Sequence, residues 1–120
     1  MDTDAESRGT DEGGMVYPDD MDEVGWPQNL TGDARFLHCD QHVKEQALEL
    51  LWEPFGQEHD LSFELMDIED VSAGQLPLLH HAIGMLLEEG VDAALGNYLA
   101  QLQAFVGDLM RQGKGLTVSL

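Results

Sequence analysis

The side chains best suited to chemistry in this sequence gather between residues 38 and 42. His38, Cys39 and His42 carry imidazole and thiol groups, the usual ligands of zinc and copper, and Asp40 or the more distant His59 offers a further ligand. The same stretch also fits a junction between a strand and a helix, where a cysteine packs as a small apolar side chain and the imidazoles need not converge. The sequence leaves both interpretations open, and we keep the metal site as a hypothesis.

Other reactive groups lack the partners that catalysis requires. His80 and His81 are adjacent, so on a helix they project about 100° apart and do not chelate one ion together. Ser72 and Ser119 lie in no motif that activates a nucleophile, and no glycine-rich loop has the spacing that cradles phosphate. We therefore expect neither enzymatic activity nor a bound cofactor.

Acidic residues dominate the composition and limit the class of partner. The 120 residues include 24 aspartates and glutamates against 5 lysines and arginines, a formal net charge of −19. Such a charge repels phosphate backbones and anionic lipid, so we expect a basic protein partner, no direct nucleic-acid binding and no membrane binding. Residues 1–70 hold 20 acids and 3 bases, whereas residues 71–120 hold 4 acids and 2 bases, so the basic partner should contact the first part.

The elements that must position these groups follow from hydrophobic periodicity. Residues 35–38 fit a short strand, and Asp40 fits the N-cap of a helix that we expect to end at Glu53, because Pro54 disfavours helical geometry in the residue before it. The remaining predicted elements are a strand over 61–68, helices over 77–90 and 92–112, and a terminal strand over 116–120.

This element order, β-α-β-α-α-β, favours an α/β or α+β domain over residues 32–120. A strand, a helix of this length and a second strand usually form a right-handed crossover between parallel strands. We therefore expect a small, mostly parallel sheet of three or four strands packed against three helices. Residues 1–31 are strongly acidic and predict a largely disordered tail. A second interpretation of residues 15–30, which include Trp26, is a segment that docks onto the domain or orders on binding a partner.

Cysteine usage and the first residues bear on location. Cys39 is the single cysteine and has no internal partner, which favours a reducing compartment and hence the cytoplasm. The first residues, MDTDAESRGTDEGG, lack the apolar core of a signal peptide, and the later apolar runs are interrupted by His, Gly and Glu. We expect no targeting segment and no membrane span.

Two stretches resemble parts of known families. LSFELMDIEDVSAGQLPLL is similar to the strand, turn and helix of STAS domains, whose turn carries a phosphoacceptor before a glycine. Here Val71 and Ala73 stand where that family has an Asp and the phosphoacceptor, and Ser72 is the hydroxyl left in the turn. ALELLWEPFGQEHDLSFELMDIED resembles the first helix and next strand of thioredoxin-like proteins, with Gln41 and Lys44 at the positions of the paired cysteines. The second resemblance implies a fold without redox activity.

The outer positions of the helix over 92–112 are small or uncharged, which suits the close approach of another helix and favours a homodimer or a partner-docking face. With the acidic first half, this predicts a non-enzymatic acidic protein-interaction module, such as a regulator, an inhibitor or an accessory chaperone. The alternatives are a nucleic-acid-mimicking inhibitor of a DNA-binding protein and a small metal-binding accessory protein that uses His38, Cys39 and His42. The predicted partner-binding residues are Asp19, Asp20, Asp22, Glu23, Trp26, Glu64, Asp67, Glu69, Asp70, Asn97, Gln101 and Asp108.

Overall fold

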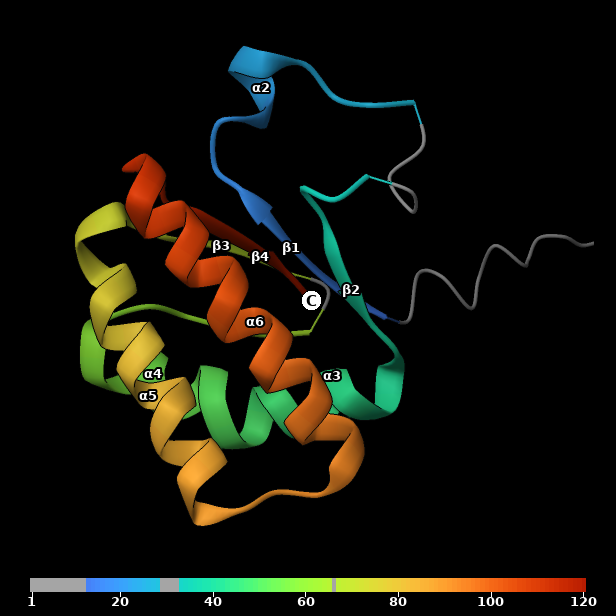
Figure 1. Ribbon diagram of the computed structural model, residues 1–120, viewed down its shortest axis with the longest axis vertical. Helices are drawn as coiled ribbons and strands as arrows, with labels where there is room; N and C mark the ends of the chain where they lie inside the picture. Colours follow the sequence, from blue (N-terminus) through green and yellow to red (C-terminus); the bar gives the residue numbers. More distant parts are fainter. Residues whose placement is uncertain (1–12, 29–32, 66) are drawn as a thin grey trace, which may run out of the picture.

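Four antiparallel strands form the sheet in the computed structural model, which describes residues 13–28, 33–65 and 67–120 (Figure 1). The strands lie in the order β2-β1-β4-β3, and each neighbouring pair is antiparallel. The first and last strands therefore pair with each other at the centre of the sheet. The bounds are Gly14–Pro18 for β1, Leu37–Cys39 for β2, Ile68–Val71 for β3 and Leu116–Ser119 for β4.

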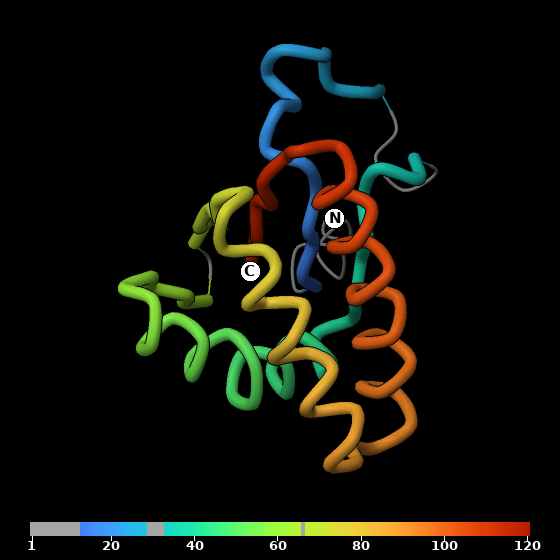
Figure 2. Tube along the Cα trace, turned by 60° about the vertical axis from the view of Figure 1, so that its left-hand side comes forward, coloured from blue at the N-terminus to red at the C-terminus, as the bar shows by residue number. Residues whose placement is uncertain are grey.

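The larger helices pack on one face of this sheet, which we call the inner face (Figure 1). Figure 2 shows α5 and α6 side by side and running in opposite directions, while the short helix α2 lies beyond one end of the sheet. The bounds are Met21–Val24 for α2, Gln41–Ala47 for α3, Leu48–Trp52 for the π-helical turn η1, Glu53–His59 for α4, Ala73–Gln75 for the 3-10 turn η2, Leu76–Glu89 for α5 and Ala93–Gln112 for α6.

Alternate residues of the two central strands build the core together with the helices. Val16, Leu116 and Val118 are fully buried, and α6 contributes Leu99 and Leu102 from its apolar stripe. A period of two along the strands and of 3.6 along the helix directs these side chains toward one another. Full burial of an aliphatic side chain stabilises a fold by about 1.5–3 kcal/mol, so this layer holds the sheet and the helices together.

The prediction of a mostly parallel sheet is wrong, because every strand pair in the described residues is antiparallel. The predicted crossover made the strands over 35–38 and 61–68 parallel neighbours. The corresponding strands β2 and β3 instead lie at opposite edges of the sheet, with β1 and β4 between them. Between β3 and β4 the chain forms the antiparallel pair α5 and α6 (Figure 2). The chain therefore re-enters the sheet at the end where it left, and β4 runs opposite to β3. The domain is α+β.

The prediction of a disordered tail over 1–31 is wrong for residues 14–18, which form β1. A stretch as short as GMVYP, followed directly by acidic residues, carries little local signal for a strand, because its stability comes from pairing with β2 and β4. Pro18 is tolerated because the pairing with β2 ends at Val16, so no ladder amide is needed there. Residues 1–12 and 29–31 of the predicted tail lie outside the described residues.

The helix that begins after Asp40 does not end at Glu53, as predicted, but continues through Pro54. The chain widens into the π-helical turn η1 directly before this proline, and α4 follows it. Wider spacing of the turn reduces the clash between the proline ring and the preceding carbonyl groups. Continuation also buries Trp52 and Phe55 in the core. Tertiary burial thus overrides the local helix-stop signal.

The predicted strand over 61–68 is displaced, since β3 begins only at Ile68. The apolar alternation in this stretch depends on Phe63, which is buried against Trp52 with the ring centroids 5.2 Å apart. Leu65 is exposed, and residues 61–65 form an irregular connection. Phe63 and the partly buried Leu61 pack against the core without strand pairing, and this imitates a strand pattern.

The predicted helix caps are confirmed. Asp40 accepts a hydrogen bond from the Val43 amide at 2.9 Å, and Asp92 accepts one from the Leu95 amide at 2.9 Å. These carboxylates satisfy amide groups that have no partner within the first turn of a helix. Gly113 ends α6 in the left-handed conformation with a φ of 71°, which glycine adopts without strain.

Gly115, directly before β4, should not tolerate a side chain. A Cβ added there would lie 2.8 Å from the carbonyl oxygen of Val71 and would also meet the Asp19 carboxylate. We predict that Gly115→Ala lowers the free energy of unfolding in urea by about 1–3 kcal/mol, the usual cost of overpacking. Gly74→Ala is the control, because its Cβ would meet nothing within 4 Å. Equal stability of Gly115→Ala and the wild type would contradict the close packing around β4.

Candidate functional site

The sheet face away from the helices, which we call the outer face, carries a different set of side chains. Tyr17, Thr117 and Asp70 occupy one row of register across β1, β4 and β3, and Ile68 lies in the next outward-facing row. Successive strand residues point to opposite faces, so these positions alternate with core residues such as Val118. The segment 19–28, which contains α2, packs against the outer face.

Three aromatic rings hold that segment in place. The ring centroid of Trp26 lies 5.2 Å from that of Tyr17 and 5.9 Å from that of Phe36, and Tyr17 and Phe36 are 5.3 Å apart. Aromatic pairs at such spacing contribute about 0.5–1.5 kcal/mol beyond their buried area. Tyr17, Phe36 and the nearby Met21 are buried, whereas Trp26 remains 48% exposed. Docking of this segment onto the domain is therefore confirmed, and it leaves one indole partly open to solvent.

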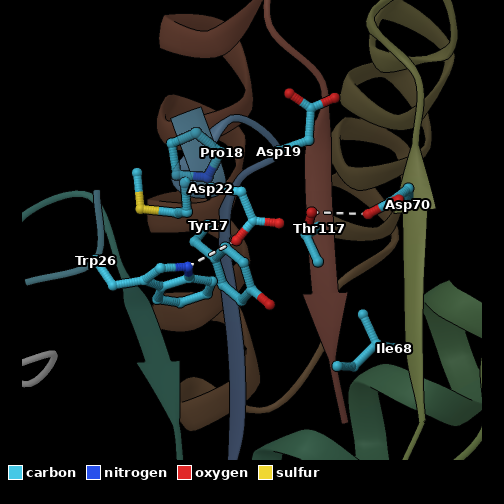
Figure 3. A pocket seen from close by; sticks show the side chains of 9 residues that line it. Tyr17, Pro18, Asp19, Asp22, Trp26, Ile68, Asp70 and Thr117 are labelled. Carbon is cyan, nitrogen blue, oxygen red and sulfur yellow. Dashed lines mark hydrogen bonds between the residues drawn. The ribbon is translucent and has the colours of Figure 1, made fainter. Parts of the chain in front are cut away.

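A pocket with a volume of about 210 Å³ opens between this segment and the sheet (Figure 3). In Figure 3 the strands β1, β4 and β3 follow one another from left to right. Trp26 lies to the left of Tyr17, and Asp70 lies to its right. The pocket combines aromatic surface, carboxylates and an exposed aliphatic side chain, and we call it the outer-face pocket. Its lining includes Tyr17, Asp19, Asp22, Trp26, Ile68, Asp70 and Thr117.

Two carboxylates of the outer-face pocket are oriented by hydrogen bonds. The indole Nε1–H of Trp26 donates to Asp22 Oδ1 at 2.9 Å, and the hydroxyl of Thr117 donates to Asp70 Oδ1 at 2.7 Å (dashed lines in Figure 3). Burial raises the pKa of Tyr17, and the negative charges of Asp70 and Asp22 raise it further. Both carboxylates therefore act on the same phenol from within one cavity.

The structure brings together four of the residues predicted to bind a partner. Asp19, Asp22 and Trp26 follow β1, whereas Asp70 lies in β3, and all four line the outer-face pocket. Their convergence follows from the sheet order, because β4 separates β1 from β3 by a single strand. The predicted acidic surface is thus concentrated around an aromatic centre.

The other predicted acidic residues have internal roles or lie apart from this pocket. Asp20 forms an ion pair with Lys114 at 3.0 Å. The Glu69 carboxylate accepts hydrogen bonds from the Ser62 amide at 2.9 Å and the Asp70 amide at 3.0 Å. This carboxylate covers part of the free edge of β3, which limits pairing with foreign strands. Of the predicted acidic residues in the first half of the chain, Glu23, Glu64 and Asp67 are exposed and lie outside the pocket.

The predicted docking residues of α6 lie on a separate surface. Asn97, Gln101 and Asp108 are exposed on this helix, in the layer on the other side of the sheet from the outer-face pocket (Figure 1). Asp108 forms an ion pair with Arg111. The small outer residues of α6 and His80 of α5 border a shallow hollow between the two helices. A homodimer through this surface stays a prediction.

The structure separates the predicted metal ligands. His38 pairs with Met15 in the sheet register, whereas Cys39 packs against the core and His42 is exposed on α3. Neighbouring strand residues point to opposite faces, which keeps the imidazole of His38 away from the thiol. Burial raises the pKa of Cys39, whose thiol is hydrogen-bonded with Tyr98. Among the described residues no group of three His, Cys, Asp or Glu side chains is arranged to hold a metal ion, so the geometry gives the metal hypothesis no support.

Tyr17, Ile68 and Thr117 line the pocket but were not singled out by the sequence patterns. A signal for Thr117 was present, because GLTVSL alternates Leu116 and Val118 with hydroxyl residues and thus predicts a polar outer face for the last strand. Tyr17 could be placed only with the knowledge that residues 14–18 form a strand. Ile68 resembles any other apolar residue of the predicted strand over 61–68.

No protein-family model, curated protein or solved structure matches this chain. No helix in the part of the chain that the structure describes has the length and apolar character needed to span a membrane. The functional inference therefore rests on the geometry and charge of the outer-face pocket.

Replacing Asp70 by Asn should lower the pKa of Tyr17. The negative charge of Asp70 opposes ionisation of the phenol, so its removal makes the phenolate easier to form. A pH titration of the tyrosine ¹³Cζ chemical shifts measures this change, with Tyr98 distinguished by a pKa that burial holds well above the usual value. Glu23→Gln removes an equal charge outside the pocket and should leave Tyr17 unchanged. An identical Tyr17 titration in Asp70→Asn and the wild type would contradict the shared cavity.

Proposed function

We propose that this chain is a non-enzymatic acidic protein-interaction module that binds a basic segment of a partner protein in the outer-face pocket. The observation that carries the proposal is the meeting of Trp26 with the carboxylates of Asp22 and Asp70 in one cavity, whose lining also includes Asp19. Aromatic faces and carboxylates both attract cationic groups. A regulator, an inhibitor or an accessory chaperone with this pocket acts by occupying a basic region of its partner.

The charge of the whole chain supports the same proposal. A net charge of −19 creates a negative potential that steers a basic partner toward the protein and repels nucleic acid. The attraction between exposed charges is screened by salt, so the complex should weaken as ionic strength rises. The lone thiol of Cys39 favours the cytoplasm as the proposed compartment.

The alternative of a nucleic-acid mimic has less support. Such a mimic presents carboxylates in a regular row that imitates a phosphate backbone. In the described part of the chain, Asp20 and Glu69 are engaged within the fold, and the acids of the pocket surround aromatic rings in place of forming a row. The pocket suits a cationic side chain better than the groove of a DNA-binding protein.

Titration with a synthetic basic peptide tests the proposal. The probe is a blocked peptide with lysines and arginines separated by glycine and serine, added to ¹⁵N-labelled protein. We predict shifts of the resonances of Tyr17, Trp26 and Asp70, and an affinity that falls as salt is added. Asp22→Asn combined with Asp70→Asn should weaken binding about tenfold, because each exposed charge pair contributes about 0.2–1 kcal/mol.

The matched control is Glu88→Gln combined with Glu89→Gln, which removes the same charge at the end of α5 in the helix layer. This control should bind the peptide as tightly as the wild type does. Equal weakening in the two double variants would show an unspecific effect of net charge and contradict a role of the pocket. Resonance shifts confined to the helix layer would contradict it as well.

A further inference from the structure

We propose that the outer-face pocket takes the guanidinium of an arginine side chain from a partner protein, in preference to the ammonium of lysine. The inference rests on the proposed function and specifies the partner group that the pocket recognises. The guanidinium lies between Asp22 and Asp70, beside the partly exposed indole of Trp26.

Each of these two carboxylates has one oxygen engaged by the fold. Asp22 Oδ1 accepts from the indole of Trp26, and Asp70 Oδ1 accepts from the hydroxyl of Thr117. Among the described residues no donor is paired with Oδ2 of either carboxylate. The internal hydrogen bonds therefore fix both groups, and within the described residues one oxygen of each has no donor. Two oriented acceptors across one cavity suit a cation that carries donors on two edges.

The pocket has no counter-ion from the described part of the chain. Each lysine and arginine there is engaged elsewhere: Arg35 pairs with Asp33, Lys114 with Asp20 and Arg111 with Asp108, and the buried Lys44 donates to the Leu120 carbonyl oxygen. Within these residues the negative charge of the pocket is therefore not neutralised by a lysine or arginine side chain. An external cation that binds there displaces no ion pair formed between the described residues.

Arginine matches this arrangement better than lysine. A guanidinium is planar and carries donors along its edges, so it can bond two carboxylates while its face stacks on an aromatic ring. An ammonium is a compact, strongly hydrated point charge and cannot make both kinds of contact at once. The hydrogen bond to Asp22 fixes the indole of Trp26, which is 48% exposed and offers its ring to such a plane.

The size and rim of the pocket indicate a protein side chain as the source of the guanidinium. Its volume of about 210 Å³ lies below the roughly 300–1,000 Å³ of pockets that enclose small-molecule ligands. Ile68, in the lining, is 62% exposed, the highest fraction among the large apolar side chains of the described residues. A polypeptide that carries the arginine can cover Ile68 with an adjacent apolar residue. A free guanidinium compound has no such residue and leaves Ile68 in water.

Three blocked peptides that differ at one position test the inference. That position holds arginine, lysine or the neutral isostere citrulline, and a leucine follows it in each peptide. We expect the arginine peptide to bind about fivefold more tightly than the lysine peptide, and the citrulline peptide to show no saturable binding. Isothermal titration calorimetry gives the affinities, and the indole N–H resonance of Trp26 reports occupancy.

Asp22→Asn and Asp70→Asn should each bring the ratio of arginine to lysine affinity close to one, because a single remaining carboxylate serves both cations alike. Glu64→Gln removes an exposed charge outside the pocket and should preserve the ratio. Equal affinities in the wild type would overturn the arginine preference and leave the basic-partner proposal standing. If neither cationic peptide binds, both proposals fail. Binding of N-acetyl-arginine amide as tight as that of the arginine peptide would overturn a protein source.

Discussion

The pairing of β1 with β4 at the centre of the sheet is the constraint on which the rest of the structure depends. β1 joins β2 to the sheet and covers one side of β4, while β4 joins β3. Without β1, the short strand β2 has no partner in the observed sheet, and a long row of backbone groups on β4 loses its hydrogen bonds. Unpaired backbone groups of this kind are costly when they are shielded from water. Gly115, directly before β4, packs closely against Asp19 after β1 and against Val71 of β3, so there is no room for a side chain at the start of β4.

One strand also connects the core to the candidate site. Val16 points into the core and Tyr17 points to the outer face, because successive strand residues alternate. Tyr17 then forms the floor on which Trp26 and the segment 19–28 pack, and that segment supplies Asp22 to the outer-face pocket. The geometry of the pocket therefore depends on the register of β1 against β4. Loss of this register would therefore remove the pocket.

Local signals in the sequence predict the elements that local interactions stabilise. The caps at Asp40 and Asp92, the apolar stripe of α6 and the alternation in β4 are each contained in a short stretch, and the structure confirms them. β1 was missed because its stability comes from strands far along the chain. The parallel pairing was wrong because it assumed that β2 and β3 are neighbours, whereas β1 and β4 lie between them in a strand order that periodicity does not report.

The sequence predicted the chemical types of the residues in the candidate site but not where in the fold they meet. The excess of acid indicated a basic partner, and Asp19, Asp22, Trp26 and Asp70 were among the expected contacts. Their convergence required the order of the strands. Glu69 shows the opposite case, since its charge suggested a partner contact but both oxygens bond to amides of its own chain.

Amide hydrogen exchange in β1 tests the central pairing most directly. The Asp19 amide donates to the Gly115 carbonyl at 3.1 Å, and the alternation of an antiparallel ladder then directs the Tyr17 amide toward β4 and the Val16 amide toward β2. If β1 is an integral central strand, Val16 and Tyr17 exchange as slowly as Val118, because all three amides open only with global unfolding. Exchange of Val16 and Tyr17 orders of magnitude faster than that of Val118 would show that β1 is a separable arm and contradict this structure of the site.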